Sequence, residues 1–292
     1  MFKGSYVAIV TPFVNGKLDQ GGLRKNIRFL MKAGSAGLVA CATTGESPTL
    51  SEQEYETIIR ICAEEAKRKI PVIAGAGTNS TEKTIKMMHR AQAYGATGLL
   101  AVTPYYNRPT QEGLYQHYRE LNRHTDLSII IYNVPSRTGV NILPKTVARL
   151  ADECRRIKAI KEASGNLDQV SELKMMVSSS FDILSGDDSL TFPMMAIGAK
   201  GVISVIANIL PKDVARMCDS FFKGHITKTR ELHLKMFPVV KALFAETSPV
   251  PVKKAMELMH MPAGKPRLPL VEMSRENTKA LKSALIGYGI KL

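Results

Sequence analysis

The sequence predicts an α/β fold: a (β/α)8 TIM barrel followed by a C-terminal helical extension. Eight short runs rich in valine, isoleucine, leucine and alanine recur along the first two-thirds of the 292-residue chain. Continuous apolar runs of this kind are typical of parallel strands that are buried on both faces. The sequence lacks the early G-x-G-x-x-G turn that a doubly wound sheet often carries. The barrel is therefore favoured over a doubly wound sheet or two smaller domains.

The predicted strands follow one another at roughly even spacing. They cover residues 6–11, 37–42, 70–75, 98–103, 128–133, 157–162, 181–185 and 201–206. Between most of them apolar residues recur three and four positions apart, as at Leu23, Ile27 and Leu30, which indicates helices. Strand and helix therefore alternate along the chain.

Helix-start signals lie where this alternation requires them. Ser51 and Glu54 have the spacing of a capping box, in which each side chain binds the other residue's backbone amide. Other start signals are the candidate N-caps Ser80 and Thr110 and the first-turn prolines Pro144 and Pro211. Each signal precedes a helical pattern, so the predicted helices have physically reasonable beginnings.

The last part of the chain carries no further strand runs. Helical patterns cover about 226–246, 250–260 and 273–288. We therefore divide the chain into a barrel at 1–224 that carries the active site and a helical region at 225–292. No low-complexity linker separates the two, so we expect the helical region to pack on the barrel.

The cysteine content and the first apolar run limit the classes of protein to which the chain can belong. The cysteines are far apart and show no CxxC pair or ligand-spaced histidine, so they predict reduced thiols and neither disulfides nor a zinc site. The first apolar run, 6–10, is too short for a signal peptide or a membrane span. We therefore expect a cytoplasmic protein that needs no metal and no other cofactor.

The charge balance raises the question of a polyanionic partner. The chain has 40 basic and 26 acidic residues, a net charge of +14. The charges are scattered, and the clusters 67–69 and 155–156 precede strands, where cations complement the end of a helix. We therefore expect neither a nucleic acid nor a membrane partner, and a non-catalytic polyanion-binding barrel remains the alternative from another class.

Lys161 is the most informative residue, because it places an amine at the end of the sixth run. The loops that follow the strands form the active face of a TIM barrel. A neutral amine in a partly desolvated pocket can trap a carbonyl group as a Schiff base. The alternative for such a residue is a solvated lysine at a strand end.

Other strand ends supply matching chemistry. Tyr132 with Thr43 or Thr44 can relay the protons that Schiff-base chemistry moves, although a tyrosine ring can also simply pack at the barrel mouth. Thr43, Thr44 and the next glycine can bind a carboxylate. Arg137 lies in a Pro-Ser-Arg-Thr-Gly turn, where it can clamp a carboxylate or remain solvated.

Three acidic residues also follow strands. Glu46 and the pair Asp187 and Asp188 have the donor atoms for a metal, but no histidine stands near either. We therefore expect these carboxylates to be solvated or to cap helices.

These motifs together resemble the dihydrodipicolinate synthase and N-acetylneuraminate lyase superfamily of class I aldolases. The sequence has C-A-T-T-G-E at 41–46, Y-N-V-P at 132–135 and K-E-A-S-G at 161–165, with Cys41 in place of the usual glycine. The likeness covers essentially the whole chain. Arg137 resembles the synthase branch, which implies condensation of pyruvate with L-aspartate 4-semialdehyde to 4-hydroxy-tetrahydrodipicolinate. Sialate or ketodeoxysugar lyases are the nearest alternatives.

The resemblance also implies roles for individual residues. Lys161 would form the Schiff base with pyruvate, and Tyr132, Thr43 and Tyr106 would shuttle protons. In the family the tyrosine that matches Tyr106 crosses from a neighbouring subunit, which implies a homo-oligomer, either a dimer or a tetramer. The implied substrate-binding residues are Thr44, Arg137, Gly186 and Ile203.

Some family members are inhibited by lysine at a subunit interface. The matching residues of that site are Ser47, Asn79 and Tyr105. Departures from the family pattern occur at Glu52, Tyr55 and Lys83. Because Lys83 would repel an ammonium group, we expect weak inhibition by lysine or none.

Overall fold

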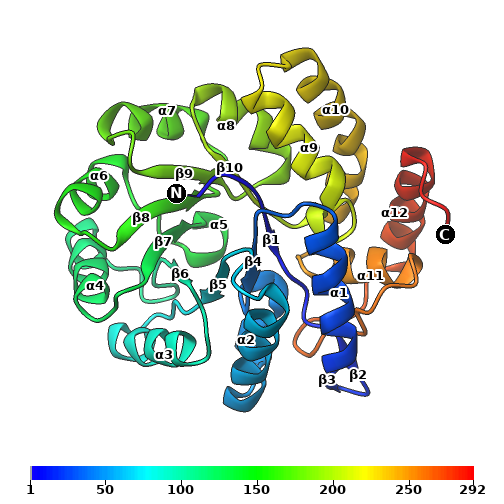
Figure 1. The fold of residues 1–292 in the computed structure, drawn as a ribbon, viewed down its shortest axis with the longest axis horizontal. Coiled ribbons are helices and arrows are strands. Elements are labelled where there is room, and N and C mark those ends of the chain that lie inside the picture. The colour runs from blue at the N-terminus through cyan, green and yellow to red at the C-terminus, as the bar shows by residue number, and fades with distance from the viewer. Residues whose placement is uncertain (1) are drawn as a thin grey trace.

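A computed structural model of the protein describes residues 2–292 and contains a closed barrel of parallel strands surrounded by helices (Figure 1). The strands are β1 (Gly4–Ala8), β4 (Gly37–Ala40), β5 (Val72–Gly75), β6 (Gly98–Val102), β7 (Ser128–Asn133), β8 (Ile157–Glu162), β9 (Asp182–Ser185) and β10 (Gly201–Ser204). They pair in the order β1-β10-β9-β8-β7-β6-β5-β4, and β1 closes the ring by pairing with β4. This confirms the predicted TIM barrel.

Several strands end earlier than their apolar runs. β4 stops at Ala40 because Cys41 has φ 53°, a left-handed conformation that interrupts the sheet ladder. The predicted strand 6–11 is observed as Gly4–Ala8, and its last residues continue into the barrel mouth. A small antiparallel hairpin, β2 (Phe13–Val14) and β3 (Lys17–Leu18), follows there.

The helices lie between the strands as predicted. They are α1 (Gln20–Lys32), α2 (Glu52–Ala66), α3 (Thr81–Ala93), α4 (Gln111–Arg123), α5 (Pro135–Thr138), α6 (Pro144–Glu153), α7 (Leu167–Met176), α8 (Thr191–Ile197) and α9 (Pro211–Phe222). Ser51 and Glu54 form the predicted capping box of α2. The other start signals are also confirmed: Ser80 caps α3, Thr110 caps α4, Pro144 begins α6 and Pro211 begins α9.

Alternating side chains divide the core into two parts. On β8, Ala159 belongs to the cluster that fills the barrel interior, whereas Ile160 belongs to the cluster between the strands and the helices. The same alternation on β7 places Ile130 inside and Ile131 outside. Lys161 therefore follows Ala159 on the inward face, near the carboxyl end of its strand.

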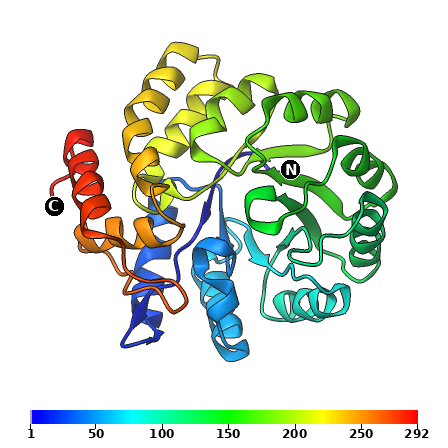
Figure 2. The same cartoon turned by 180° about the vertical axis from the view of Figure 1, so that it is seen from behind.

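Three helices follow the barrel: α10 (Ile226–Leu243), α11 (Val250–Leu258) and α12 (Arg275–Tyr288). In Figures 1 and 2, α11 and α12 lie outside the ring of barrel helices, on the side of α1 and α10. The Tyr288 hydroxyl donates to Asp213 of α9 at 2.8 Å. None of the helices within residues 2–292 is long and apolar enough to cross a membrane.

Candidate active site

Lys161 and Tyr132 meet at the carboxyl end of the barrel. They are paired residues on the neighbouring strands β8 and β7, so both side chains point to the barrel interior. The Lys161 Nζ lies 4.1 Å from the centre of the Tyr132 ring. The two residues are 4% and 6% exposed. Lys161 is therefore not a solvated lysine at a strand end, and its buried amine lies beside the ring of a tyrosine.

Two buried carboxyl groups lie at this end of the barrel, and one of them, Asp187, interacts with the lysine. Burial raises the pKa of the Asp187 carboxyl, and the charge of Lys161 offsets part of that rise. Burial also raises the pKa of Glu162, whose side chain is on the outward face of β8 and accepts hydrogen bonds from Asn133 and the Ser164 amide. Sequence reasoning missed the proximity of Asp187 to Lys161, although its place directly after β9 was a signal for it.

Thr43 and Thr44 form a tight turn after β4. The Ala42 carbonyl accepts from the amides of Gly45 and Ser47, which folds the chain back on itself. Thr44 is buried and Thr43 is half-buried. A cavity of about 50 Å³ has a wall made of Cys41, Ala42, Thr43, Ser47, Gly75, Gly77, Met87, Leu100, Val102 and Tyr132. Thr43 and Tyr132 therefore line the same cavity.

Gly186 and Ile203 lie on the opposite wall of the barrel. The Gly186 amide donates to the Glu162 carbonyl at 2.7 Å, which ties the end of β9 to β8. A Cβ atom at Gly186 would lie 2.5 Å from the Cβ of Ala163, so this close approach requires glycine. Ile203 is fully buried in the barrel interior, next to Tyr6 of β1.

Two predicted residues lie away from this cavity within the single chain. Tyr106 is 89% exposed, has φ 74° and donates its amide to the Thr138 carbonyl. Arg137 is also exposed, and its Nη2 atom donates to the Ser248 carbonyl at 3.3 Å. The predicted turn around Arg137 is instead the short helix α5, because Pro135 suits a first turn and Gly139 ends it with φ 71°.

The prediction for Glu46 was wrong, because its carboxylate is neither solvated nor a helix cap, whereas the Asp188 carboxylate binds the amides at the start of the short 3-10 helix Ile206–Asn208, as a capping carboxylate does. Glu46 is 2% exposed and pairs with Lys253 of α11 at 2.6 Å. Asp188 is 7% exposed and accepts hydrogen bonds from the amides of Val205 and Ile206. Burial raises the pKa of Asp188. No metal-binding group of three or more His, Cys, Asp or Glu residues occurs among residues 2–292.

The residues that match the family's lysine-binding site lie near the same mouth. The Asn79 carbonyl accepts from Asn107, and Tyr105 is 40% exposed. Tyr55 is buried instead and donates its hydroxyl to the Gly75 carbonyl at 3.0 Å. Glu52 pairs with Arg90 on the surface at 2.6 Å. Of the three departures from the family pattern, Tyr55 and Glu52 therefore have side-chain partners within this chain, and Lys83 is exposed.

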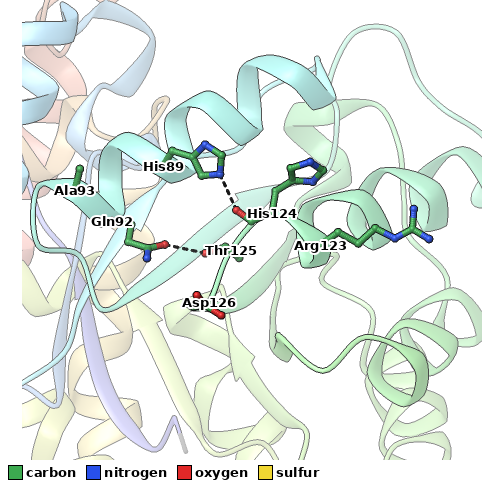
Figure 3. Close-up of a pocket in the computed structure, with 7 residues that line it drawn as sticks. All are labelled: His89, Gln92, Ala93, Arg123, His124, Thr125 and Asp126. Atoms are coloured by element: carbon green, nitrogen blue, oxygen red, sulfur yellow. Dashed lines mark hydrogen bonds between the residues drawn. The ribbon is translucent and has the colours of Figure 1, made fainter.

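A wider hollow of about 560 Å³ lies elsewhere on the molecule (Figure 3). Its lining consists of His89, Gln92, Ala93, Arg123, His124, Thr125 and Asp126. These residues belong to the ends of α3 and α4 and to the connection that leads into β7, so the hollow borders the amino ends of the strands. Catalytic groups of TIM barrels lie at the carboxyl ends, so this hollow is not the candidate site.

Comparison with known proteins gives consistent results. A family model described as the dihydrodipicolinate synthetase family matches residues 1–287. A protein of Geotalea uraniireducens named 4-hydroxy-tetrahydrodipicolinate synthase is 50% identical over 290 residues, which cover 99% of this chain and 100% of that one. A protein of the same name from Methanocaldococcus jannaschii is also 50% identical over 290 residues, with the same coverage.

Solved structures show the same likeness. The dihydrodipicolinate synthase of Thermotoga maritima superposes with a TM-score of 0.97 at 46% identity, covering 99% of each chain. A structure described as the first monomeric dihydrodipicolinate synthase variant superposes with a TM-score of 0.98, also at 46% identity, and covers 99% of this chain and 98% of that one.

Proposed function

This chain belongs to the dihydrodipicolinate synthetase family, and from that premise we propose that it acts as a 4-hydroxy-tetrahydrodipicolinate synthase. It is a class I lyase that condenses pyruvate with L-aspartate 4-semialdehyde in lysine and diaminopimelate biosynthesis. The observation that carries this proposal is the buried amine of Lys161, held over the ring of Tyr132 in the barrel mouth. A buried amine in this position has the chemistry of a Schiff-base nucleophile.

In the first half of the reaction, the neutral amine of Lys161 attacks the carbonyl carbon of pyruvate. Loss of water gives the Schiff base, and loss of a methyl proton gives the enamine. Each step moves a proton near Nζ, and we assign that transfer to Tyr132, Thr43 and Tyr106. The Tyr132 ring, whose centre lies 4.1 Å from Nζ, and the cavity that Tyr132 shares with Thr43 support this assignment.

In the second half, the enamine carbon attacks the aldehyde carbon of the semialdehyde. The amine of the semialdehyde then attacks the imine carbon, closes the ring and releases Lys161. We assign the semialdehyde carboxylate to Arg137, whose guanidinium is exposed at the barrel mouth. The pyruvate pocket is assigned to Thr44, Gly186 and the carbonyl of Ile203.

The exposure of Tyr106 supports a homo-oligomer, a dimer or a tetramer, in which this phenol enters the site of a neighbouring subunit. Tyr106 is 89% exposed in the single chain and does not line the cavity that holds Thr43 and Tyr132, so a neighbouring subunit can cover it. A cytoplasmic location is supported by the cysteines Cys41, Cys62, Cys154 and Cys218, all of which are buried free thiols.

Substrate profiling of matched variants tests the proposed function. The wild type is expected to turn over pyruvate with the semialdehyde and to leave sialate and ketodeoxysugar acids uncleaved. Lys161→Ala is expected to abolish turnover, whereas Lys158→Ala, a half-buried lysine on the same strand, retains it. Arg137→Ala is expected mainly to raise KM for the semialdehyde. Full turnover by Lys161→Ala, or preferred cleavage of a sugar acid by the wild type, would reject the assignment.

A further inference from the structure

Glu46 is a buried carboxylate that ends the threonine turn. It follows Thr43–Gly45 directly and has φ 56°, so its backbone closes the turn in a left-handed conformation. Its side chain is 1% exposed. A carboxylate at this depth needs partners for its charge. The position of those partners therefore also sets the position of the turn.

The first partner is Lys253 of α11, which connects three parts of the chain. Its Nζ atom donates to Glu46 Oε1 at 2.6 Å, to the Thr11 carbonyl at 3.3 Å and to the Lys265 carbonyl at 3.3 Å. These contacts use all three protons of an ammonium group. The ammonium also lies 4.4 Å from the centre of the Phe13 ring. Lys253 thus joins the chain after β1, the threonine turn and the C-terminal region.

The second partner is Arg267, which lies in the segment between α11 and α12. Its backbone amide donates to Glu46 Oε2 at 2.8 Å, so both carboxylate oxygens are held by the C-terminal region. Its guanidinium binds Glu54 in the first turn of α2 and the Thr49 carbonyl at 2.8 Å. The same segment runs alongside the β2–β3 hairpin (Figure 2), where the Phe13 amide donates to the Ala263 carbonyl.

Net stabilisation is a weak explanation for such a pair. Removing two charges from water costs several kcal/mol per ion, and an apolar replacement of a buried pair is often equally stable. Burial lowers the pKa of Lys253, and the hydrogen bond to Glu46 offsets part of that shift. What a buried, fully bonded pair provides is a defined position for the segments that it connects.

We propose that Lys253 and Glu46 are positioning residues, through which the C-terminal helical region holds the threonine turn in the geometry that binds the pyruvate carboxylate. This inference rests on the proposed function of Thr43 and Thr44. It assigns a specific task in substrate binding to the part of the chain beyond the barrel. The barrel strands alone leave the turn without the contacts that both oxygens of Glu46 make.

The test compares Lys253→Met, the double variant Glu46→Gln with Lys253→Met, and the control Lys254→Met. Lys254 is the next residue of α11 and pairs with the exposed Glu257 on the surface. Thermal stability, kcat and KM for pyruvate are measured for each. Lys253→Met is expected to lower stability because it leaves Glu46 charged and unpaired. It is also expected to raise KM for pyruvate about tenfold, with a smaller change in kcat. Lys254→Met is expected to match the wild type.

The double variant separates positioning from folding. It removes the unpaired charge, so stability is expected to recover. KM for pyruvate is expected to remain raised, because the ion pair between the threonine turn and α11 is still absent. A KM that returns to the wild-type value together with stability would overturn the proposal, as would an unchanged KM in Lys253→Met. If Lys253→Met fails to fold, KM for pyruvate is measured in the double variant and in Glu46→Gln alone. A raised KM in folded protein supports the proposal, and a wild-type KM overturns it. Absence of wild-type turnover would instead refute the proposed function.

Discussion

Replacement of Lys161 by methionine tests the proposal that its buried amine lowers the stability of the fold and is kept for catalysis. Lys161 is 4% exposed, its amine lies 4.1 Å from the centre of the Tyr132 ring, and no salt bridge to it is found among the described residues. A cation over an aromatic ring gains about 1–2 kcal/mol, whereas burying an ammonium costs several kcal/mol. Methionine keeps most of the apolar stem and removes the charge. We therefore expect Lys161→Met to raise the free energy of unfolding by about 1–3 kcal/mol while abolishing turnover.

Urea denaturation followed by circular dichroism measures this change. Lys158→Met is the control, because Lys158 is on the same strand but only half-buried, and we expect it to change stability by less than about 0.5 kcal/mol. A Lys161→Met variant that is less stable than the wild type would show that the amine is stabilised in place. The reasoning that a buried amine is kept for catalysis at a cost in stability would then be wrong.

The other predictions concern the barrel rim, regulation and pH. Tyr106→Phe is expected to lower kcat at least tenfold without changing the melting temperature, because its ring is 89% exposed in the single chain, and steady-state assays with thermal melts check this. Lysine is expected to inhibit weakly or not at all, and a Lys83→Glu variant to be inhibited more, which a titration of initial rates measures. Burial raises the pKa of Glu162, so the folded state keeps its proton at pH values where the unfolded state has lost it. The stability that Glu162 contributes is therefore fully present below the ordinary pKa of a glutamate, about 4.3, and falls as the pH rises from that value through the raised pKa of the folded state. Urea midpoints measured over this pH range should fall less for Glu162→Gln than for the wild type.

The fold and the centre of the site follow from local patterns. Apolar runs separated by helical periodicity define a ring of strands, and side chains alternate in and out along each strand. Lys161 near the end of β8 and Tyr132 on β7 are therefore expected at the same mouth, and the structure pairs them in register. The capping box of Ser51 and Glu54 depends on neighbours three positions apart, so it too was readable from the sequence.

Contacts between distant segments were not predictable in the same way. Glu46 and Lys253 are separated by 207 positions, and their pairing depends on how the C-terminal helices pack against the barrel. The prediction of a solvated or capping Glu46 followed the usual behaviour of a loop carboxylate, which burial by α11 overrides. The position of Tyr106 in an assembly depends on a second chain, which no spacing rule within one chain describes.

The most direct test of the central claim is reductive trapping. The protein is incubated with pyruvate and borohydride, which reduces a Schiff base to a stable amine, and the modified peptide is then identified by mass spectrometry. The predicted result is one adduct per chain, located on Lys161 and absent from Lys161→Met. No adduct, or an adduct on another lysine that persists in Lys161→Met, would contradict the assignment of Lys161 as the nucleophile.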